Sequence, residues 1–415
     1  MPPEITVLVL NYNGKGLLLD CLEACTKLEH GGVRPRVVCI DNGSSDGSLE
    51  EVRRRFPAIG VISNAENAGF APAYNAAIRA IDSEWVALLN NDTVPDPAWL
   101  TEAYAASCRH RAVCVGSRML KNGGTRVDYV GATMNFYGHG FHPHFGEPAS
   151  IQGEERPVIA ACAGAMLCRR DVFLEAGGFD EAYFAYFEDL DLCWRLNLLG
   201  HDVVYAPNSV VHHEHSSTSS AVVPGYQRLA WSERNGLRSV IKNYDEKHLA
   251  RVLPVALALC VKRAQLDSAI DPDAFFFEKT PPPPARKQVA DAAARAGWRL
   301  GRVRTILRER GPIDGPLYAA YRLLGRRFAN GRQLPEAYDA MNRLGYSRIA
   351  AIEALLRSAA DLQEKRNAVQ RARRRSDEAV AELFVDTFKP SFPHPELKEC
   401  QDTLVEAFGL RELFP

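Results

Sequence analysis

Short apolar runs alternate with segments of helical period over the first 220 residues, and a polar loop follows nearly every apolar run. The runs lie at residues 5–10, 37–40, 60–63, 85–89, 113–117, 158–169 and 203–205. Short strands separated by helices are typical of βαβ units, which build a mostly parallel sheet. The pattern therefore predicts an α/β fold, with helices near residues 71–81 and 188–199 among those that cover the sheet.

Polar residues stand at the expected carboxyl ends of four successive strands. They are Asn11 and Asn13, then Asp41, then Asn67 and Gly69, then Asn90, Asn91 and Asp92. Each alone could be a turn former, but ligands of open α/β sheets bind at this edge, so four in succession predict a binding site. Neither a P-loop nor a GxGxxG motif follows the first strand, which argues against a P-loop NTPase and an ordinary NAD-binding domain.

Five motifs then occur in one order: LNYN, IDNGSSDGS, an NxGFAxAxN pattern from residue 67, LLNNDT and GGFDEAYFAYFEDLDLCWR. In this order they resemble the family 2 glycosyltransferases, and within that family the bacterial rhamnosyltransferase-like branch. The resemblance covers roughly residues 4–245, and NNDT and EDLDLCWR are its most specific parts. It implies a GT-A fold, a nucleotide-sugar donor, a divalent metal ion (Mn²⁺ or Mg²⁺) and inversion at the anomeric carbon.

The resemblance assigns roles along the donor side. Asp41 matches the aspartate that accepts a hydrogen bond from the donor's pyrimidine base, which an acceptor-only carboxylate can do; an Asx turn is the alternative. Asp92 matches the metal-binding carboxylate of a DxD motif, and oxygen ligands suit Mg²⁺ and Mn²⁺. Because the first position of that motif is Asn90, Asp92 is the main carboxylate ligand. Donor binding is assigned to the remaining edge residues: Asn11, Asn13, Asn67, Gly69, Asn90 and Asn91.

His213 is the second predicted metal ligand, chosen by its spacing from Pro207 in a pattern that the family shares. Neutral imidazole binds Mn²⁺ better than Mg²⁺. His212 and His215 are near enough to be confused with it, although on an alternating strand only His215 shares a face with His213. A structural histidine is the alternative for each of the three.

The segment EDLDLCWR predicts a helix whose buried stripe contains Leu190, Cys193, Trp194 and Leu198. Asp189 lies at the start of this helix, where the helix dipole favours an ionised carboxylate. By resemblance Asp189 is the general base that takes the proton of the acceptor hydroxyl, and Glu188 supports placement of donor or acceptor. A plain helix cap is the alternative for Asp189.

The sequence signals for acceptor-binding residues are less specific than those for the donor side. The candidates for acceptor contact are Arg169 and Asp191, and Arg170 stands beside Arg169. For Asp191, a structural ion pair with Arg195 is the alternative. His139, His142 and His144 lie in a Gly- and His-rich loop without acidic neighbours in the sequence. That loop is interpreted as a lid with incidental histidines, or as an acceptor contact.

The remaining chain predicts three regions: a catalytic domain at 1–245, a helical segment with a Pro-rich linker at 246–285, and a helical region at 286–415. Residues 286–375 carry 21 Lys and Arg against 8 Asp and Glu, whereas residues 376–415 carry 3 against 9. The basic block is densest at Arg371, Arg373, Arg374 and Arg375. It suits peripheral contact with an anionic membrane, while a homodimer arm, a partner-docking surface or solvated helix faces explain it equally well. No nucleic-acid partner is predicted.

Ten cysteines without a CxxC pair indicate reduced core thiols, and the longest central apolar run, 253–261, is about half the length of a membrane span. We therefore expect a cytoplasmic protein, either free or peripheral at the inner face of the plasma membrane.

The predicted function is transfer of a sugar, from dTDP-rhamnose or a UDP-sugar, to a hydroxyl of a surface polysaccharide or a lipid-linked glycan. One alternative is a transferase for UDP-galactose, UDP-glucose or UDP-galactofuranose. Another is a catalytically silent scaffold that binds sugar nucleotides, which the presence of both Asp92 and Asp189 disfavours. A nucleotidyltransferase is disfavoured because no Gly-rich N-terminal loop is followed by Lys or Arg.

Overall fold

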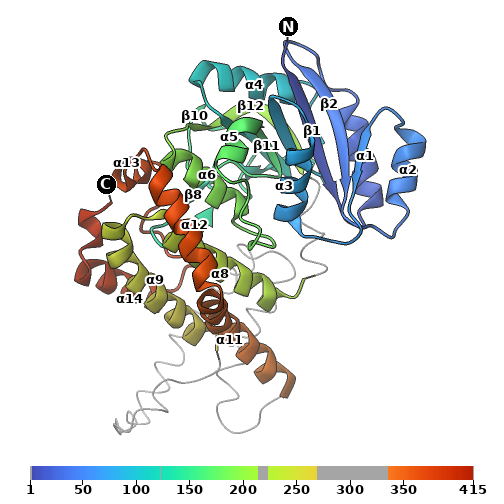
Figure 1. Cartoon of the computed structure of the whole chain (residues 1–415). Helices are drawn as coiled ribbons and strands as arrows, with labels where there is room; N and C mark the ends of the chain where they lie inside the picture. Colours follow the sequence, from blue (N-terminus) through green and yellow to red (C-terminus); the bar gives the residue numbers. More distant parts are fainter. Residues whose placement is uncertain (1, 122, 214–222, 269–334, 415) are drawn as a thin grey trace, which may run out of the picture. The chain divides into compact units, whose positions relative to one another are not determined.

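A mixed sheet organises the N-terminal part of the chain (Figure 1). The computed structural model describes residues 2–121, 123–213, 223–268 and 335–414, with side chains of the last segment described from residue 343. Within these residues the main sheet has the strand order β10-β12-β6-β11-β4-β1-β2-β3, with β5 on β12 and β7 on β6. Its strands are β1 (Glu4–Asn11), β2 (Arg34–Asp41), β3 (Gly60–Ser63), β4 (Trp85–Asn90), β5 (Thr93–Pro95), β6 (Cys114–Lys121), β7 (Arg126–Tyr129), β10 (Arg156–Pro157), β11 (Ala165–Arg169) and β12 (Val203–His213).

The first four strands of the chain, β1 to β4, pair in parallel, while β11 runs antiparallel between β4 and β6. Strand β4 is buried along its first five residues, as expected for a parallel strand covered on both faces. A separate hairpin joins β8 (Thr133–Met134) to β9 (Gly140–Phe141). The mostly parallel α/β sheet predicted from the sequence is confirmed.

Helices connect the strands and continue to the C-terminus. They are α1 (Lys15–Cys25), α2 (Ser48–Arg55), α3 (Phe70–Ala80), α4 (Trp99–His110), α5 (Arg170–Glu175), α6 (Glu188–Leu198), α8 (Gly225–Asn243), α9 (Glu246–Asp267), α11 (Pro335–Arg357), α12 (Ala359–Ala372), α13 (Asp377–Ala381), α14 (Pro395–Ala407) and the 3₁₀ turn η3 (Leu410–Glu412). Helix α1 buries the stripe expected from its sequence, Leu18, Cys21, Leu22 and Cys25. None of the helices in these described segments is both long and apolar enough to cross a bilayer.

Strand β12 is much longer than the predicted 203–205. A register shift between Ala206 and Val210 accommodates Pro207, so that the strand resumes its pairing with β6 and runs on to His213. This extension carries His212 and His213 to β5, where His213 pairs with Thr93.

The chain divides into two compact units, residues 1–259 with 351–415, and residues 260–350. In the first unit α12 lies alongside α8, so the C-terminal residues from 351 onward pack with the sheet domain (Figure 1). The boundaries at 245 and 285 stay predictions. The proline run 281–284 and the aromatic triplet 275–277 lie outside the described residues.

A buried ionic network holds α6, α8 and α12 together. Lys242 on α8 donates to Asp180 (2.8 Å) and Asp191 (2.9 Å), and all three side chains are almost completely buried. Arg238 also contacts Asp180, at 3.3 Å, and Lys365 on α12 does so at 2.6 Å. Burial alone would raise the pKa of Asp180, but these cations lower it well below its usual range. The network therefore fixes how α12 sits on the sheet domain.

Two of the four arginines in the densest basic stretch are used inside the fold. Arg373 donates to the carbonyl of Asn243 and pairs with Asp377 at 2.9 Å. Arg375 donates to the carbonyl of Gly200 (3.0 Å) and pairs with Asp202 (2.7 Å), just beyond the end of α6. These two arginines therefore bind within the fold, while membrane contact through the basic helices stays a prediction.

The ionic network generates a stability prediction. Lys242→Met should lower the free energy of unfolding by about 3–5 kcal/mol, because two buried carboxylates lose a shared cation. Lys398→Met is the matched control, since Lys398 pairs with Asp402 on the surface and should contribute less than about 1 kcal/mol. Urea unfolding measures both changes in the free energy of unfolding, provided that the slope of this free energy against urea concentration is the same in the variants and the wild type. Equal effects of the two substitutions would show that the network does not stabilise the fold.

Candidate active site at the carboxyl edge of the sheet

Strand register brings the predicted polar residues to one edge. Asn11 pairs with Asp41 across β1 and β2, and Leu10 pairs with Asn90 across β1 and β4. Asp41 also pairs with Ser63 at the end of β3. The carboxyl ends of these parallel strands therefore lie side by side, as ligand sites of open α/β sheets require.

Most asparagines of this edge hold the loops to one another. Asn11 is fully buried, donates to Ser44 (3.1 Å) and Ser48 (3.0 Å), and accepts from Asn91 at 2.8 Å. Asn13 has a left-handed backbone and accepts from the amide of Ser45. The side chain of Asn11 thus bonds with Asn91 and with the loop after β2, so its contribution at this edge is to hold the loops, while donor contact by Asn91 stays a prediction.

Asn42 was missed in the sequence. Its side chain donates to Asn67 (2.9 Å) and to the carbonyl of Gly69, and accepts from Asn64. It therefore joins the loop after β2 to the loop before α3. Gly69 has φ +90, and a Cβ there would meet the Phe184 ring at 3.0 Å, so the loop itself requires glycine at this position.

Three buried carboxylate oxygens lack a hydrogen-bond partner among the described residues: Asp41 Oδ1, Asp92 Oδ1 and Glu188 Oε2. The three side chains belong to residues of 3–7% exposure. A buried polar group without a partner costs about 1–3 kcal/mol, so native proteins rarely keep such groups unless something else binds there. All three belong to residues that the sequence predicts for the site.

Asp92 and His213 meet through the pairing of β5 with β12. His213 Nε2 lies 3.3 Å from Asp92 Oδ2, and His213 Nδ1 lies 2.8 Å from Asp128 Oδ2. Burial would lower the pKa of His213, but the hydrogen bonds that the ring donates to both carboxylates raise it to about 10. His212 points elsewhere, to Asp96 at 3.0 Å. Geometry therefore favours His213 over His212, and His215 lies outside the described residues.

These residues suit a divalent cation. Asp92 keeps one buried oxygen unpaired, and the other faces the imidazole nitrogen of His213. Oxygen and neutral imidazole ligands together are acceptable to Mn²⁺, so binding of the cation would displace the His213 proton that faces Asp92. Asp128, which was missed in the sequence, contacts the opposite ring nitrogen, and carboxylates in that position orient metal-binding histidines. The signal for Asp128 in the sequence is an acidic residue within a short strand, between Val127 and Tyr129.

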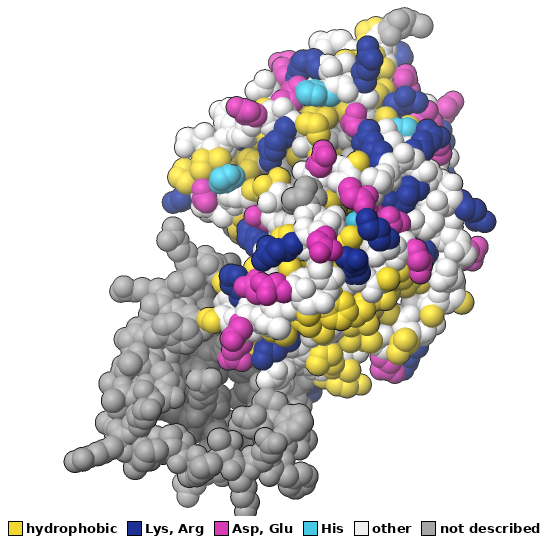
Figure 2. Space-filling model, turned by 90° about the vertical axis from the view of Figure 1, so that its left-hand side faces the viewer, with side chains coloured by type: hydrophobic (Ala, Val, Ile, Leu, Met, Phe, Trp, Pro, Cys, Tyr) yellow, Lys and Arg dark blue, Asp and Glu magenta, His cyan; other side chains and the backbone are white. Residues whose placement is uncertain are grey.

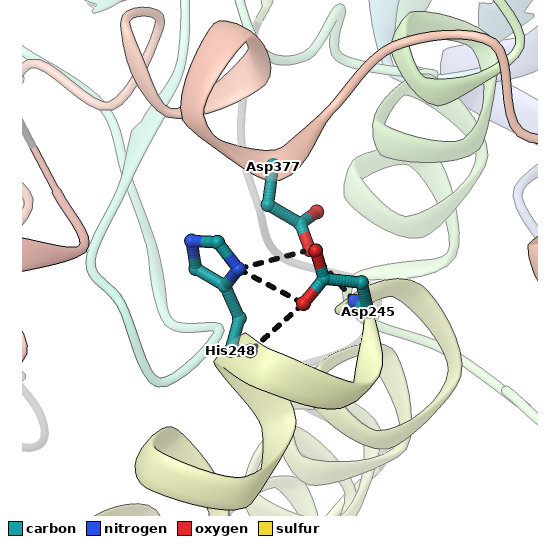
Figure 3. Close-up of side chains that lie close together, drawn as sticks. All are labelled: Asp245, His248 and Asp377. Carbon is teal, nitrogen blue, oxygen red and sulfur yellow. Dashed lines mark hydrogen bonds and ion pairs between the residues drawn. The ribbon is translucent and has the colours of Figure 1, made fainter.

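A second cluster lies elsewhere, formed by Asp245, His248 and Asp377 (Figure 3). Their ligand atoms lie within 4.8 Å of one another, close enough for a metal ion. However, His248 Nδ1 already contacts Asp245 (2.9 Å), and the amide of Asp245 donates to Asp377 (2.6 Å). Arg373 also pairs with Asp377. Because the carboxylate oxygens already accept hydrogen bonds from a guanidinium and from N–H groups, we interpret the cluster as a structural contact that holds α9 against α13.

Asp189 and Glu188 are the first two residues of α6. Asp189 accepts from the amides of Ala163 (3.0 Å) and Leu190 (2.7 Å). Despite these bonds, burial raises the pKa of Asp189. The prediction that the helix start favours its ionised form is therefore outweighed by desolvation. Burial and the charge of Asp189 raise the pKa of Glu188 to about 8, so Glu188 is mostly protonated at neutral pH.

One loop links these carboxylates to the metal-binding edge. The amide of Ala163 binds Asp189, and the carbonyl of the next residue, Gly164, accepts from the amide of Asn90 at 3.0 Å. The segment before β11 therefore places the start of α6 against the end of β4, and the predicted catalytic pair lies at the predicted donor edge.

The structure does not bring the predicted acceptor contacts into this site. Arg169 pairs across the sheet with Trp85, at the amino end of β4, and its guanidinium binds Asp171. Arg170 donates to the carbonyl of Ile78. Asp191 is fully buried, where Lys242 and Arg195 bind it. Both acceptor assignments, Arg169 and Asp191, are corrected because one lies at the far edge and the other inside the ionic network.

Two of the loop histidines have an acidic neighbour, which for His139 comes from α8 and for His144 from the same loop. His139 lies 3.6 Å from the buried Glu233, and the exposed His144 lies 3.2 Å from Glu147. A positive charge on His142 favours the ionised forms of Asp128 and Asp189.

Known proteins are similar in sequence to the part of the chain that carries this site. The model of a family described as "Glycosyltransferase like family 2" matches residues 2–233. An N-acetylglucosaminyl-diphospho-decaprenol L-rhamnosyltransferase of Mycobacterium tuberculosis is 28% identical over 207 residues, 44% of this chain and 67% of that protein. The O-antigen biosynthesis protein RfbC of Myxococcus xanthus is 31% identical over 236 residues, 54% of this chain but 18% of that protein. Rhamnosyltransferase WbbL of Escherichia coli is 43% identical over 65 residues, 15% of this chain and 25% of that protein.

Two solved structures have limited similarity to this chain. GalNAc-T7 with UDP, GalNAc and Mn²⁺ has a TM-score of 0.48 at 17% identity, over 62% of this chain and 51% of that one. The mannosyltransferase PcManGT of Pyrobaculum calidifontis with GDP-Man and Mn²⁺ has a TM-score of 0.46 at 17% identity, over 86% and 88%. At these values no residue role is transferred from either structure.

The contact between Asp128 and His213 generates a metal-binding prediction. Asp128→Asn should weaken Mn²⁺ binding by ~10–100-fold, because His213 loses the carboxylate that orients its ring. Asp96→Asn is the matched control, since Asp96 contacts the neighbouring His212 instead and should leave Mn²⁺ affinity unchanged. Free Mn²⁺ is measured by electron paramagnetic resonance during titration. Equal affinities of the two variants would exclude His213 as an oriented ligand.

Proposed function

Because this chain belongs to glycosyltransferase family 2, we propose that it is an inverting enzyme that transfers a sugar from a nucleotide-diphosphate donor to a hydroxyl. The donor proposed first is dTDP-rhamnose, with UDP-sugars as the alternative. The acceptor proposed is a hydroxyl of a surface polysaccharide or of a lipid-linked glycan. Two relatives named as rhamnosyltransferases, and one named for O-antigen biosynthesis, support this choice.

One observation carries the proposal: Asp41, Asp92 and Glu188 each have a buried carboxyl oxygen without a hydrogen-bond partner among the described residues. Asp41 and Asp92 lie at the strand ends, and Glu188 starts α6. Asp41 Oδ1 can accept a hydrogen bond from the imide N–H of thymine or uracil. Asp92 and His213 are the residues that would hold a divalent cation, which supplies charge to offset the negative charge of the leaving nucleotide. Glu188 adds the third unpaired oxygen beside Asp189.

The two carboxyl groups at the start of α6 have different proposed roles, one as a base and the other as a hydrogen-bond donor. Asp189, held by two backbone amides, takes the proton of the acceptor hydroxyl as that oxygen attacks the anomeric carbon. Its raised pKa brings it closer to neutrality, which strengthens it as a base. Glu188 is mostly protonated at neutral pH and can donate a hydrogen bond to a substrate oxygen. A single displacement with this base inverts the anomeric carbon.

Donor screening with a base variant tests the proposal. The full chain with Mn²⁺ should release nucleoside diphosphate from one of dTDP-rhamnose, UDP-galactose, UDP-glucose or UDP-galactofuranose. Asp189→Asn should lower the turnover number by a factor of ~10² or more while leaving donor affinity nearly intact. Asp171→Asn, far from the site and paired with Arg169, is the control. Absence of turnover with every donor would favour a silent sugar-nucleotide-binding scaffold.

The pKa values of the pair predict the pH profile. The rate kcat/KM should fall as pH drops through the raised pKa of Asp189, because the base becomes protonated. It should also fall as pH rises through about 8, because Glu188 loses its proton. Glu188→Gln cannot ionise, so the alkaline fall should vanish while the acid fall remains. Loss of the acid fall in this variant would instead make Glu188 the base.

Peripheral contact with an anionic membrane is also proposed, since the acceptor can be lipid-linked. Basic and acidic side chains are interspersed on the face seen in Figure 2 rather than gathered in one basic field. A contact made through this face should therefore be weak and sensitive to salt. Sedimentation with vesicles of phosphatidylglycerol should pull down more protein than phosphatidylcholine vesicles at low salt; equal amounts would exclude electrostatic contact.

A further inference from the structure

The turn before α6 has an unusual backbone. Tyr186 (φ +71) and Phe187 (φ +67) are consecutive non-glycine residues in the left-handed region. Helix α6 begins directly after them, with Glu188 and Asp189 as its first residues. L-residues avoid this conformation unless the surrounding structure enforces it. Contacts that hold this turn therefore also decide where the two carboxyl groups point.

Asn235 on α8 supplies those contacts. Its side chain is completely buried, and Nδ2 donates to the carbonyls of Ala185 (2.9 Å) and Tyr186 (2.7 Å). Both amide hydrogens are therefore used on two successive peptide groups, which fixes the orientation of the chain entering the left-handed turn. The oxygen of the same amide accepts from Arg234, whose guanidinium binds the carbonyl of Ala182.

The same segment touches the donor side of the site. The carbonyl of Phe184 accepts from the amide of Phe70, the first residue of α3, at 3.3 Å. The Phe184 ring also lies against Gly69 in the loop before that helix. Residues 183–187 therefore lie between the donor-side loop and the carboxyl groups of α6.

Further contacts of helix α8 fix the position of Asn235. Ser239 donates to the carbonyl of Asn235 and lies 2.9 Å from the hydroxyl of Tyr183. Lys242, two turns further on, binds Asp191 within α6. The distance between α8 and α6 is thereby set at one end by an ion pair and at the other by the Asn235 amide.

We infer that Asn235 is a positioning residue of the transfer site. It holds Tyr186 and Phe187 in the left-handed conformation and so directs the Asp189 carboxylate toward the acceptor oxygen. The inference rests on the proposed function for its catalytic consequence, but the effect on the turn stands independently of it.

Asn235→Asp tests the inference in the full chain, because it keeps the shape of the side chain and replaces the two donors with acceptors. Ser232→Ala is the matched control, since the Ser232 hydroxyl bonds within α8, to the carbonyl of Arg228. With Mn²⁺ and dTDP-rhamnose, or the UDP-sugar that the wild type turns over, kcat of Asn235→Asp should fall ~10²-fold. The donor KM should stay within about threefold, as expected when a group acts in the transition state.

Hydrogen exchange of backbone amides gives a readout that needs no activity. Peptides covering residues 183–190 should exchange ~10-fold faster in Asn235→Asp, whereas peptides of α1 should not change. Asn235→Ser, which also removes the two donors to the turn, replaces the first variant if that one does not fold. Unchanged exchange at 183–190, or an unchanged kcat, would overturn the inference. A wild type inactive with every donor would instead defeat the proposed function, and the exchange data would still decide whether Asn235 holds the turn.

Discussion

The site depends on the pairing of the short strand β5 with the end of β12. This antiparallel register sets His213 opposite Thr93 and so brings its ring to Asp92, which directly precedes Thr93. Without the register shift that takes β12 past Pro207, the strand would end near residue 205 and neither histidine would reach this edge. The parallel register of β1 with β2 and β4 then aligns Asp41 and Asn90 at the same edge.

Such a site is costly to fold, and neighbouring packing offsets the cost. Three buried carboxylate oxygens without partners among the described residues each oppose folding, and two left-handed residues add strain at the start of α6. Behind α6, Lys242 binds Asp180 and Asp191, while Lys365 extends the network to α12. The C-terminal helices from residue 351 are therefore part of the support of the site rather than a separate appendage.

Sequence pattern was sufficient for the strands of the parallel half, because buried parallel strands are almost wholly apolar and their helices keep a regular period. It also identified Asp41, Asp92 and Glu188, whose unpaired oxygens support the chosen positions. It could not show which asparagine side chains hydrogen-bond to one another at this edge, as those of Asn11 and Asn91 do. Asp128, Asn42 and Asn235 act through contacts between distant segments, which no local pattern reveals.

The central claim is that Asp92 and His213 form the metal-binding pair of a sugar-transfer site. Anomalous diffraction at the manganese edge, from crystals of the full chain grown with Mn²⁺ and UDP, tests it most directly. The predicted result is a peak within coordination distance of an Asp92 carboxylate oxygen and His213 Nε2. A peak at Asp245, His248 and Asp377 instead, or none beside Asp92, would contradict it.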